Sequence, residues 1–97
     1  MRADYDSEGD TVQIDLAPVD RVDYGDDTVD DGLVIGMCDG KPVRIDVIGT
    51  GGDLGASLRR AGERFGLDSE ALLAAARAAV AAPDREVVVD VGSRAAA

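Results

Sequence analysis

Apolar and polar residues alternate along the first half of the chain with the period of two that is typical of half-buried β-strands. Val12, Ile14 and Leu16 are separated by polar residues. Residues 33–38 and 42–48 form two further apolar segments, which flank the turn-forming pair Asp39-Gly40. Short strands are also expected at residues 2–5 and 21–24. This half of the chain therefore predicts four or five antiparallel strands.

The parity of the apolar residues suggests a register for the hairpin of residues 33–38 and 42–48. A two-residue turn would set Ile35 opposite Arg44, an apolar residue against a charged one. A three-residue loop 38–40, with Gly40 in the left-handed region, sets Ile35 opposite Val43 instead. We therefore expect the three-residue loop. The apolar face of this hairpin would then consist of Leu33, Ile35, Val43, Ile45 and Val47.

The second half of the chain has the spacing of amphipathic helices. Leu54, Leu58, Ala61 and Phe65 recur at helical intervals, and Gly66 follows at the position of a C-cap. Gly55 and Gly62 each weaken such a helix by about 1 kcal/mol relative to Ala, so packing must hold it.

A second helix is expected from Asp68, its N-cap, to Pro83, with Glu70 favourably placed in its first turn. We expect one side of this helix to carry Leu72, Leu73, Ala76 and Val80. Residues 86–91 are rich in valine and predict a last strand that is buried on both faces. Residues 94–97 are expected to form a frayed tail.

These elements predict one small α+β domain over residues 1–97. It consists of an acidic β-rich half at 1–48, two helices within 53–82 and a C-terminal strand at 86–91. We expect an antiparallel meander of four to five strands with both helices on one face and the C-terminal strand joining the sheet. The helices should point their apolar residues at Val12, Ile14, Leu33, Ile35 and Ile45.

The net charge and the composition of the chain exclude several classes of function. The chain has 20 acidic and 10 basic residues, a net charge of −10, and 13 of the acids lie in residues 1–50. Such a chain is not expected to bind nucleic acid, which requires clustered Lys and Arg. It has no histidine and only one cysteine, Cys38, which excludes His-dependent triads and cysteine-pair zinc sites. No apolar run is long enough for a membrane span and no signal peptide is evident, so a cytoplasmic protein is expected.

Acids at alternate positions near the N-terminus suggest a metal site. Asp4, Asp6, Glu8 and Asp10, with Gly9 between the last two, superficially follow the pattern of a calcium loop that would close at Asp15. The flanking residues are predicted to form strands, however, and Asp15 would lie within one of these strands. We therefore favour an acidic β-turn over a calcium site or a metal-dependent hydrolase. No cofactor is expected.

Three other features could carry chemistry. The glycine-rich segment 49–55 leads into a helix but lacks the spacing of a dinucleotide loop and the lysine of a phosphate-binding loop, so we interpret it as a connector. Cys38 has no basic neighbour before Lys41 and reads as a small apolar residue. A group of acids in a predicted loop reads as a solvated charge run: Asp26, Asp27, Asp30 and Asp31.

Two blocks of the sequence resemble a known family. The block from Tyr5 to Leu16 and the block from Asp31 to Ile48 resemble the bacterial domain-of-unknown-function family 2283. The resemblance covers residues 2–48, and Arg44 and Asp46 stand where the family usually has Gly and Glu. It implies a compact antiparallel sheet and no established activity. It also suggests an antitoxin-like role, because members are sometimes encoded beside small toxin-like proteins.

Three hypotheses about function follow. The first, which we favour, is a non-catalytic module whose acidic surface binds a basic partner protein, with Asp20, Asp23, Asp26 and Asp27 as candidate contact residues. The second is the metal-dependent hydrolase. The third is a structural homo-oligomer. Any homodimer should form through the helical half or the segment 87–89, which carry almost no net charge.

Overall fold

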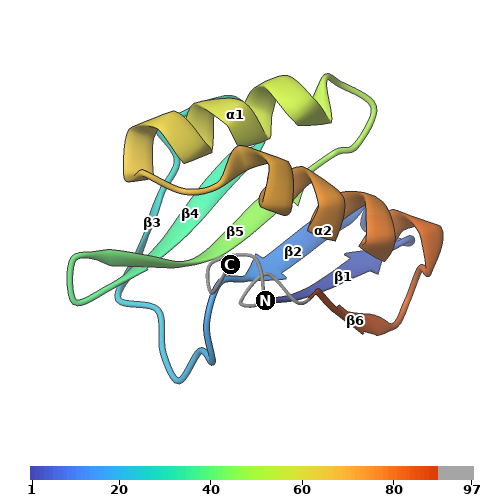
Figure 1. Ribbon diagram of the computed structural model, residues 1–97, viewed down its shortest axis with the longest axis horizontal. Helices are drawn as coiled ribbons and strands as arrows, with labels where there is room; N and C mark the ends of the chain where they lie inside the picture. The colour runs from blue at the N-terminus through green and yellow to red at the C-terminus, as the bar shows by residue number, and fades with distance from the viewer. Residues whose placement is uncertain (90–97) are drawn as a thin grey trace, which may run out of the picture.

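The computed structural model describes residues 1–89 and shows a six-stranded sheet covered by two helices (Figure 1). All neighbouring strands are antiparallel, in the order β3-β4-β5-β2-β1-β6. The strands are β1 (Arg2–Asp6), β2 (Thr11–Asp15), β3 (Tyr24–Asp26), β4 (Leu33–Cys38), β5 (Lys41–Ile48) and β6 (Glu86–Val88). The helices are α1 (Leu54–Phe65) and α2 (Ser69–Ala81).

The core lies between the sheet and the helices, which both pack on the same face (Figure 1). Alternate residues of the four central strands enter it, because side chains on a strand point to opposite faces in turn. The strand side of the core consists of Ala3, Val12, Ile14, Leu33, Ile35, Met37, Ile45 and Val47. The helices contribute Leu58, Ala61, Leu72, Ala75, Ala76 and Ala79. The predicted α+β class, the helical layer and the C-terminal strand that joins the sheet are thereby confirmed.

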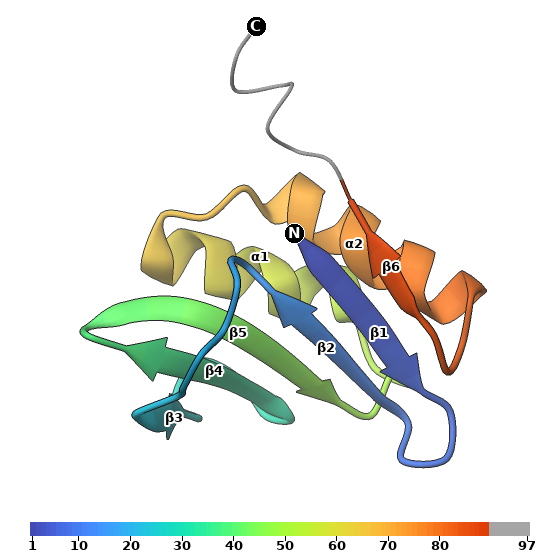
Figure 2. The same ribbon diagram turned by 90° about the horizontal axis from the view of Figure 1, so that it is seen from below.

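The strand order departs from a continuous meander between β2 and β3. β2 pairs with β5, whereas β3 lies at the far edge beside β4. The segment 16–23 must therefore cross β5 and β4, and it does so on the face that the helices leave uncovered (Figure 2). We call this segment the strap. The strand expected at 21–24 starts later, at Tyr24.

The expected register of the β4–β5 hairpin is wrong. Asp39 and Gly40 form a two-residue turn in which both residues have positive φ, 53° and 75°, and Cys38 pairs with Lys41. The register then shifts between Gly36 and Met37, which leaves Val43 as the extra residue of a β-bulge. The bulge restores the apolar pairing that a plain two-residue turn would lose, because Ile35 lies opposite Ile45.

The predicted helix ends are confirmed. The Asp68 side chain accepts hydrogen bonds from the backbone N–H groups of Glu70 and Ala71, and Gly66 has the left-handed conformation of a C-cap. The buried side of α2 is rotated from the expected one. Val80 is 38% exposed and Leu73 is only partly buried, whereas Leu72 and Ala76 are buried as expected, together with Ala71, Ala75 and Ala79.

The last strand is shorter and more exposed than expected. β6 ends at Val88, lies at the edge of the sheet beside β1, and leaves the Val88 side chain 71% exposed. The prediction that it is buried on both faces is therefore wrong for these residues. The expected continuation to residue 91 and the frayed tail 94–97 lie outside the described residues.

Candidate functional site

The face of the sheet opposite the helices carries two rows of mostly polar side chains. Cross-strand pairing fixes the rows, because paired residues point to the same face. The first row runs from β6 to β4 through Glu86, Asp4, Gln13, Asp46 and Val34. The second row runs through Val88, Arg2, Asp15, Arg44 and Gly36. We call the surface formed by these rows the open face (Figure 2).

One ion pair lies at the centre of the open face. Arg44 Nε donates a hydrogen bond of 2.7 Å to Asp15 Oδ1, and both side chains are more than two-thirds buried. The strap crosses close to the pair, because Val22 packs over Gly36, the residue that lies beside Arg44 on β4. The only other arginine in the two rows, Arg2, lies 3.5 Å from Glu86 in an exposed pair. The carboxylates of the open face thus outnumber its guanidinium groups.

Asp4 and Asp46 are the carboxylates in excess. Both are half-buried, and neither accepts a hydrogen bond from residues 1–89. Burial raises the pKa of Asp46 above its ordinary value, and Asp15 and Asp4 raise it further while Arg44 opposes the rise. Burial likewise raises the pKa of Asp4, with Asp15 and Glu86 adding to the effect. In both cases the surroundings disfavour the ionised form relative to an exposed carboxyl.

The strap bounds the open face on the side of β4. Val22 lies against the backbone of Gly36, where an added Cβ would come within 3.3 Å of the valine methyl groups. Nearer to β6, a hollow of about 420 Å³ separates the strap from the N-terminal strand. Its lining is mixed: Met1, Ala17, Pro18, Val19 and Val88 are apolar, and Arg2, Asp15 and Asp20 are charged.

The N-terminal acids that superficially follow the calcium-loop pattern do not converge on one point. Asp4 belongs to the open face, and Asp6 Oδ1 accepts the backbone N–H groups of Glu8 and Gly9 in the β1–β2 turn. The exposed Glu8 carboxylate accepts no hydrogen bond from the described residues. Asp10 Oδ1 accepts the hydroxyls of Tyr5, at 2.8 Å, and Thr50, at 2.5 Å. These residues build the acidic turn that the sequence favoured.

Asp10 also connects distant parts of the chain. Its Oδ2 accepts the Thr50 backbone N–H, and its carbonyl accepts the N–H of Gly49. The bonds to Thr50 and Tyr5 lower the pKa of the Asp10 carboxyl. The start of the glycine-rich segment 49–55 is therefore tied to the β1–β2 turn, which supports its interpretation as a structural connector.

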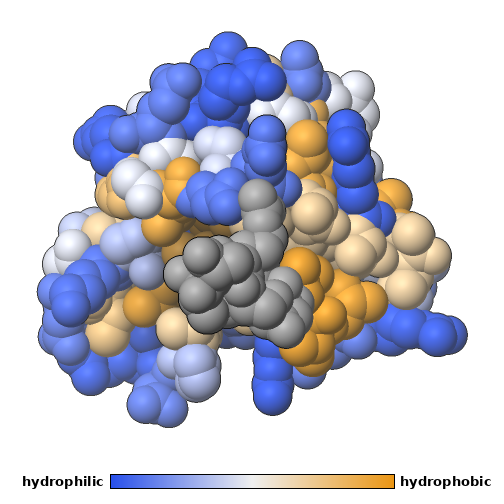
Figure 3. All heavy atoms as spheres, viewed as in Figure 1, coloured by the Kyte–Doolittle hydropathy of each residue, from blue (hydrophilic) through white to orange (hydrophobic). Residues whose placement is uncertain are grey.

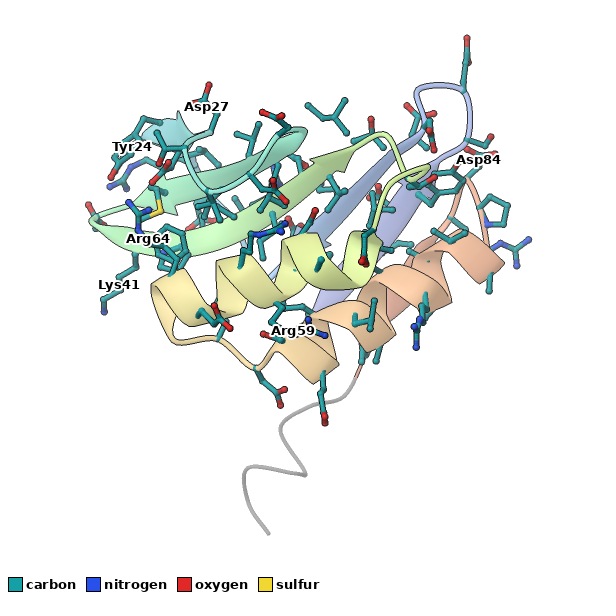
Figure 4. All side chains as sticks on the ribbon, turned by 90° about the horizontal axis from the view of Figure 1, so that it is seen from above. Tyr24, Asp27, Lys41, Arg59, Arg64 and Asp84 are labelled. Carbon is teal, nitrogen blue, oxygen red and sulfur yellow. The ribbon has the colours of Figure 1, made fainter. Side chains whose placement is uncertain are left out.

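The four candidate contact residues lie outside the two rows. Asp20 is an exposed residue of the strap, and Asp27 directly follows β3 at the same edge of the sheet as Tyr24 (Figure 4). Asp23 accepts hydrogen bonds from Arg21 and from the Asp39 backbone N–H, whereas Asp26 accepts from Thr28. Two of the four carboxylates are therefore already used within the chain.

The acidic run 26–31 is more than a solvated loop. Asp30 Oδ2 accepts hydrogen bonds from Ser57 Oγ, at 2.8 Å, and from Arg60, at 2.6 Å. These bonds fix the β3–β4 connection to α1, and the Ser57 bond is the main reason for the lowered pKa of Asp30. Asp31 remains exposed.

One group of metal-ligating atoms gathers within residues 1–89, and it lies outside the N-terminal acids that were the weak metal candidates of the sequence. Ligand atoms of Asp23, Cys38 and Asp39 lie within 4.8 Å of one another. Arg21 already donates to both carboxylates, at 2.9 and 2.8 Å, and so supplies the positive charge there. Burial raises the pKa of the Cys38 thiol, which opposes formation of a thiolate ligand. The arrangement stabilises the β4–β5 turn. It does not favour a metal ion, because Arg21 already neutralises the two carboxylates and the thiol resists deprotonation.

Sequence reasoning missed the central residues of the open face as a group. Asp15, Arg44 and Asp46 alternate with apolar residues of β2 and β5, so the period of two already directed them away from the core. The period of two does not reveal that β2 pairs with β5, and this pairing brings Asp15 beside Arg44.

Comparison with known proteins identifies no relative: no family model, no curated protein and no solved structure matches the chain. No helix within the described part of the chain is long and apolar enough to cross a membrane.

Proposed function

We propose that this protein is a non-catalytic interaction module that binds a basic segment of a partner protein on its open face. The proposal rests on the burial of Asp4 and Asp46 without hydrogen-bond donors from the described residues. Two half-buried carboxylates without hydrogen-bond donors from residues 1–89 cost free energy in the isolated protein. A partner that supplies guanidinium or ammonium groups would remove this cost.

The chemistry within the open face indicates the kind of contact. Arg44 already satisfies Asp15 with a short, shielded ion pair. Asp4 and Asp46 lie on either side of Gln13 in the same row, two strand spacings or roughly 10 Å apart. A partner arginine placed over Gln13 would repeat for these two carboxylates what Arg44 does for Asp15. Asp20, at the margin of the face, extends the negative potential that attracts such a partner.

The antitoxin-like role that the family resemblance implies would use the same chemistry, with a small basic toxin as the partner. The alternative hypotheses receive less support. The hydrolase hypothesis needs convergent ligands, whereas the ligand atoms of Asp4, Asp6, Glu8 and Asp10 form no metal-binding group within residues 1–89, and Asp6 and Asp10 accept hydrogen bonds from different parts of the chain. A homo-oligomer would use a different surface, the edge strand β6.

A peptide-binding experiment tests the proposal. A short synthetic peptide of alternating arginine and alanine would be titrated into the wild type and into Asp4→Asn/Asp46→Asn by calorimetry at about 0.1 M NaCl, where the Debye length is about 10 Å. We expect the double variant to bind at least about tenfold more weakly, because a hydrogen bond between charged groups contributes on the order of 1.5 kcal/mol or more.

The matched control removes the same charge from the helical layer. Glu63 and Glu70 are exposed residues of α1 and α2, so Glu63→Gln/Glu70→Gln changes the net charge equally without touching the open face. We expect this variant to bind within about twofold of the wild type, because exposed charges at a distance are screened. Equal weakening of both variants would show that only net charge matters and would contradict the proposal.

A further inference from the structure

β6 is an edge strand with backbone groups that point away from the sheet. In the β1–β6 ladder, Ala3 pairs with Val87, and the Val89 N–H bonds the Met1 carbonyl at 2.9 Å. Hydrogen bonding alternates along an antiparallel strand, so the odd-numbered residues bond inward to β1. The N–H and C=O groups of Glu86 and Val88 therefore face outward, where a further strand could pair with them.

Charge distinguishes this edge from the opposite one. The β3 edge carries Asp23, Asp26 and Asp27 within five residues of sequence, so two copies would repel one another there. At the β6 edge, the five residues 84–88 include Asp84, Arg85 and Glu86 and so carry a net charge of only −1, and Glu86 also lies 3.5 Å from Arg2. In a chain of net charge −10, β6 is thus the edge at which a second copy meets least repulsion.

The surface around β6 is also apolar. The Val88 side chain is 71% exposed, the largest value among the large hydrophobic residues of the described chain. α2 packs over β6 and β1, and its only charged residues are Glu70 and Arg77. Val80, near the C-terminal end of α2, is 38% exposed. Apolar residues gather over β6 below this helix (Figure 3).

From these observations we propose that two copies of this chain pair through β6 in an antiparallel, two-fold arrangement. Centred on Val87, such pairing lets Glu86 of one copy exchange backbone hydrogen bonds with Val88 of the other. Val87 then meets its symmetry mate on the helical side of the sheet, beneath α2. The two sheets become one, and their open faces lie side by side on its other surface.

The contact is small, so the dimer should depend on concentration. Sedimentation equilibrium of the full chain, from about 10 μM to 1 mM, should show a mass rising from the monomer toward twice that value. Val88→Pro removes one outward N–H without breaking a bond to β1, because proline is tolerated at strand edges. Val88→Glu places a carboxylate opposite Glu86 of the other copy. Both variants should remain monomeric over the whole range.

Ile48→Glu is the matched control, because Ile48 is 55% exposed on β5 and distant from the edge. It should associate as the wild type does. Circular dichroism establishes whether each variant is folded. If Val88→Pro does not fold, Val88→Glu alone tests the proposal. A wild type that stays monomeric at 1 mM, or a folded Val88 variant that still dimerises, would overturn the proposal whether or not the open face binds basic peptides.

Discussion

Two aspartates of this protein show how far local surroundings decide what a carboxylate contributes. Asp10 accepts hydrogen bonds from the hydroxyls of Tyr5 and Thr50, which stabilise its ionised form and lower its pKa. Asp46 is half-buried, lacks such donors and has a raised pKa. Ionised Asp10 therefore stabilises the fold at neutral pH, whereas ionised Asp46 destabilises it.

The difference leads to a prediction for Asp46→Asn. A carboxyl whose pKa is higher in the folded than in the unfolded state binds its proton more tightly when folded, so stability rises as the pH falls toward its ordinary pKa. The uncharged amide removes the cost of ionisation at pH 7. We expect Asp46→Asn to melt at a higher temperature than the wild type at pH 7, and this gain to shrink as the pH approaches about 4.

Asp27→Asn is the control, because Asp27 is exposed and its substitution removes the same charge. Thermal melts of both variants across this pH range separate the local effect from that of net charge. The prediction fails if the increase in melting temperature caused by Asp46→Asn is no larger than that caused by Asp27→Asn, or if it is independent of pH. Either result would show that the open face does not destabilise the ionised form of Asp46.

At the scale of elements, the two glycines of α1 have different reasons to be there. A Cβ on Gly62 would collide with the Ser69 side chain and lie 2.9 Å from the Leu67 carbonyl oxygen, where the two helices meet. A Cβ on Gly55 would make only ordinary contacts, at 3.6 Å or more. Gly62 thus allows α2 to begin directly against α1, and Gly55 has no such role.

We therefore predict opposite effects of the same substitution in one helix. Gly55→Ala should stabilise the protein by up to about 1 kcal/mol, the difference in helix propensity. Gly62→Ala gains the same propensity but must displace the start of α2, so it should destabilise the protein by about 1–3 kcal/mol. Urea unfolding of the two variants measures both values. A stabilising Gly62→Ala would mean that the helices can separate at no cost.

How well each element could be predicted depends on the range of the interactions that form it. Gly66 and Asp68 terminate the helices through bonds to residues at most four positions away, and the sequence predicted both. The bulge at Val43 depends on how β5 pairs with β4 on one side and with β2 on the other, since the Val43 carbonyl accepts the Leu16 N–H. The turn sequence alone contains no sign of that second strand.

At the scale of the whole molecule, the candidate site is a consequence of strand order. β2 lies between β1 and β5, so Asp4, Asp15 and Asp46 lie on the same open face although 42 positions separate the first from the last. The sequence indicated an acidic strand half but placed the contacts at Asp20 to Asp27, in the strap and on β3. Alternation along a strand is visible in sequence, whereas the identity of its neighbours depends on the packing of the complete sheet.

We expect the thermal stability of the whole molecule to depend on salt. A net charge of −10 on a small domain produces self-repulsion, which salt screens over a Debye length of about 10 Å at 0.1 M. Ion pairs weaken in salt as well, but four of the five found among residues 1–89 involve exposed arginines and contribute little. Repulsion should therefore dominate, and the melting temperature should rise between low salt and about 0.5 M NaCl.

A variant with fewer charges separates screening from other effects of salt. Asp20 and Asp27 are exposed and accept no hydrogen bond or ion pair from the described residues, so Asp20→Asn/Asp27→Asn lowers repulsion without removing a bond. Its melting temperature at low salt should exceed that of the wild type, and its rise with NaCl should be smaller, because less repulsion remains to be screened. An equal rise in both proteins would assign the effect to exclusion of the salt from the surface. A fall in both would mean that ion pairs such as Arg44–Asp15 outweigh the repulsion among the remaining acids.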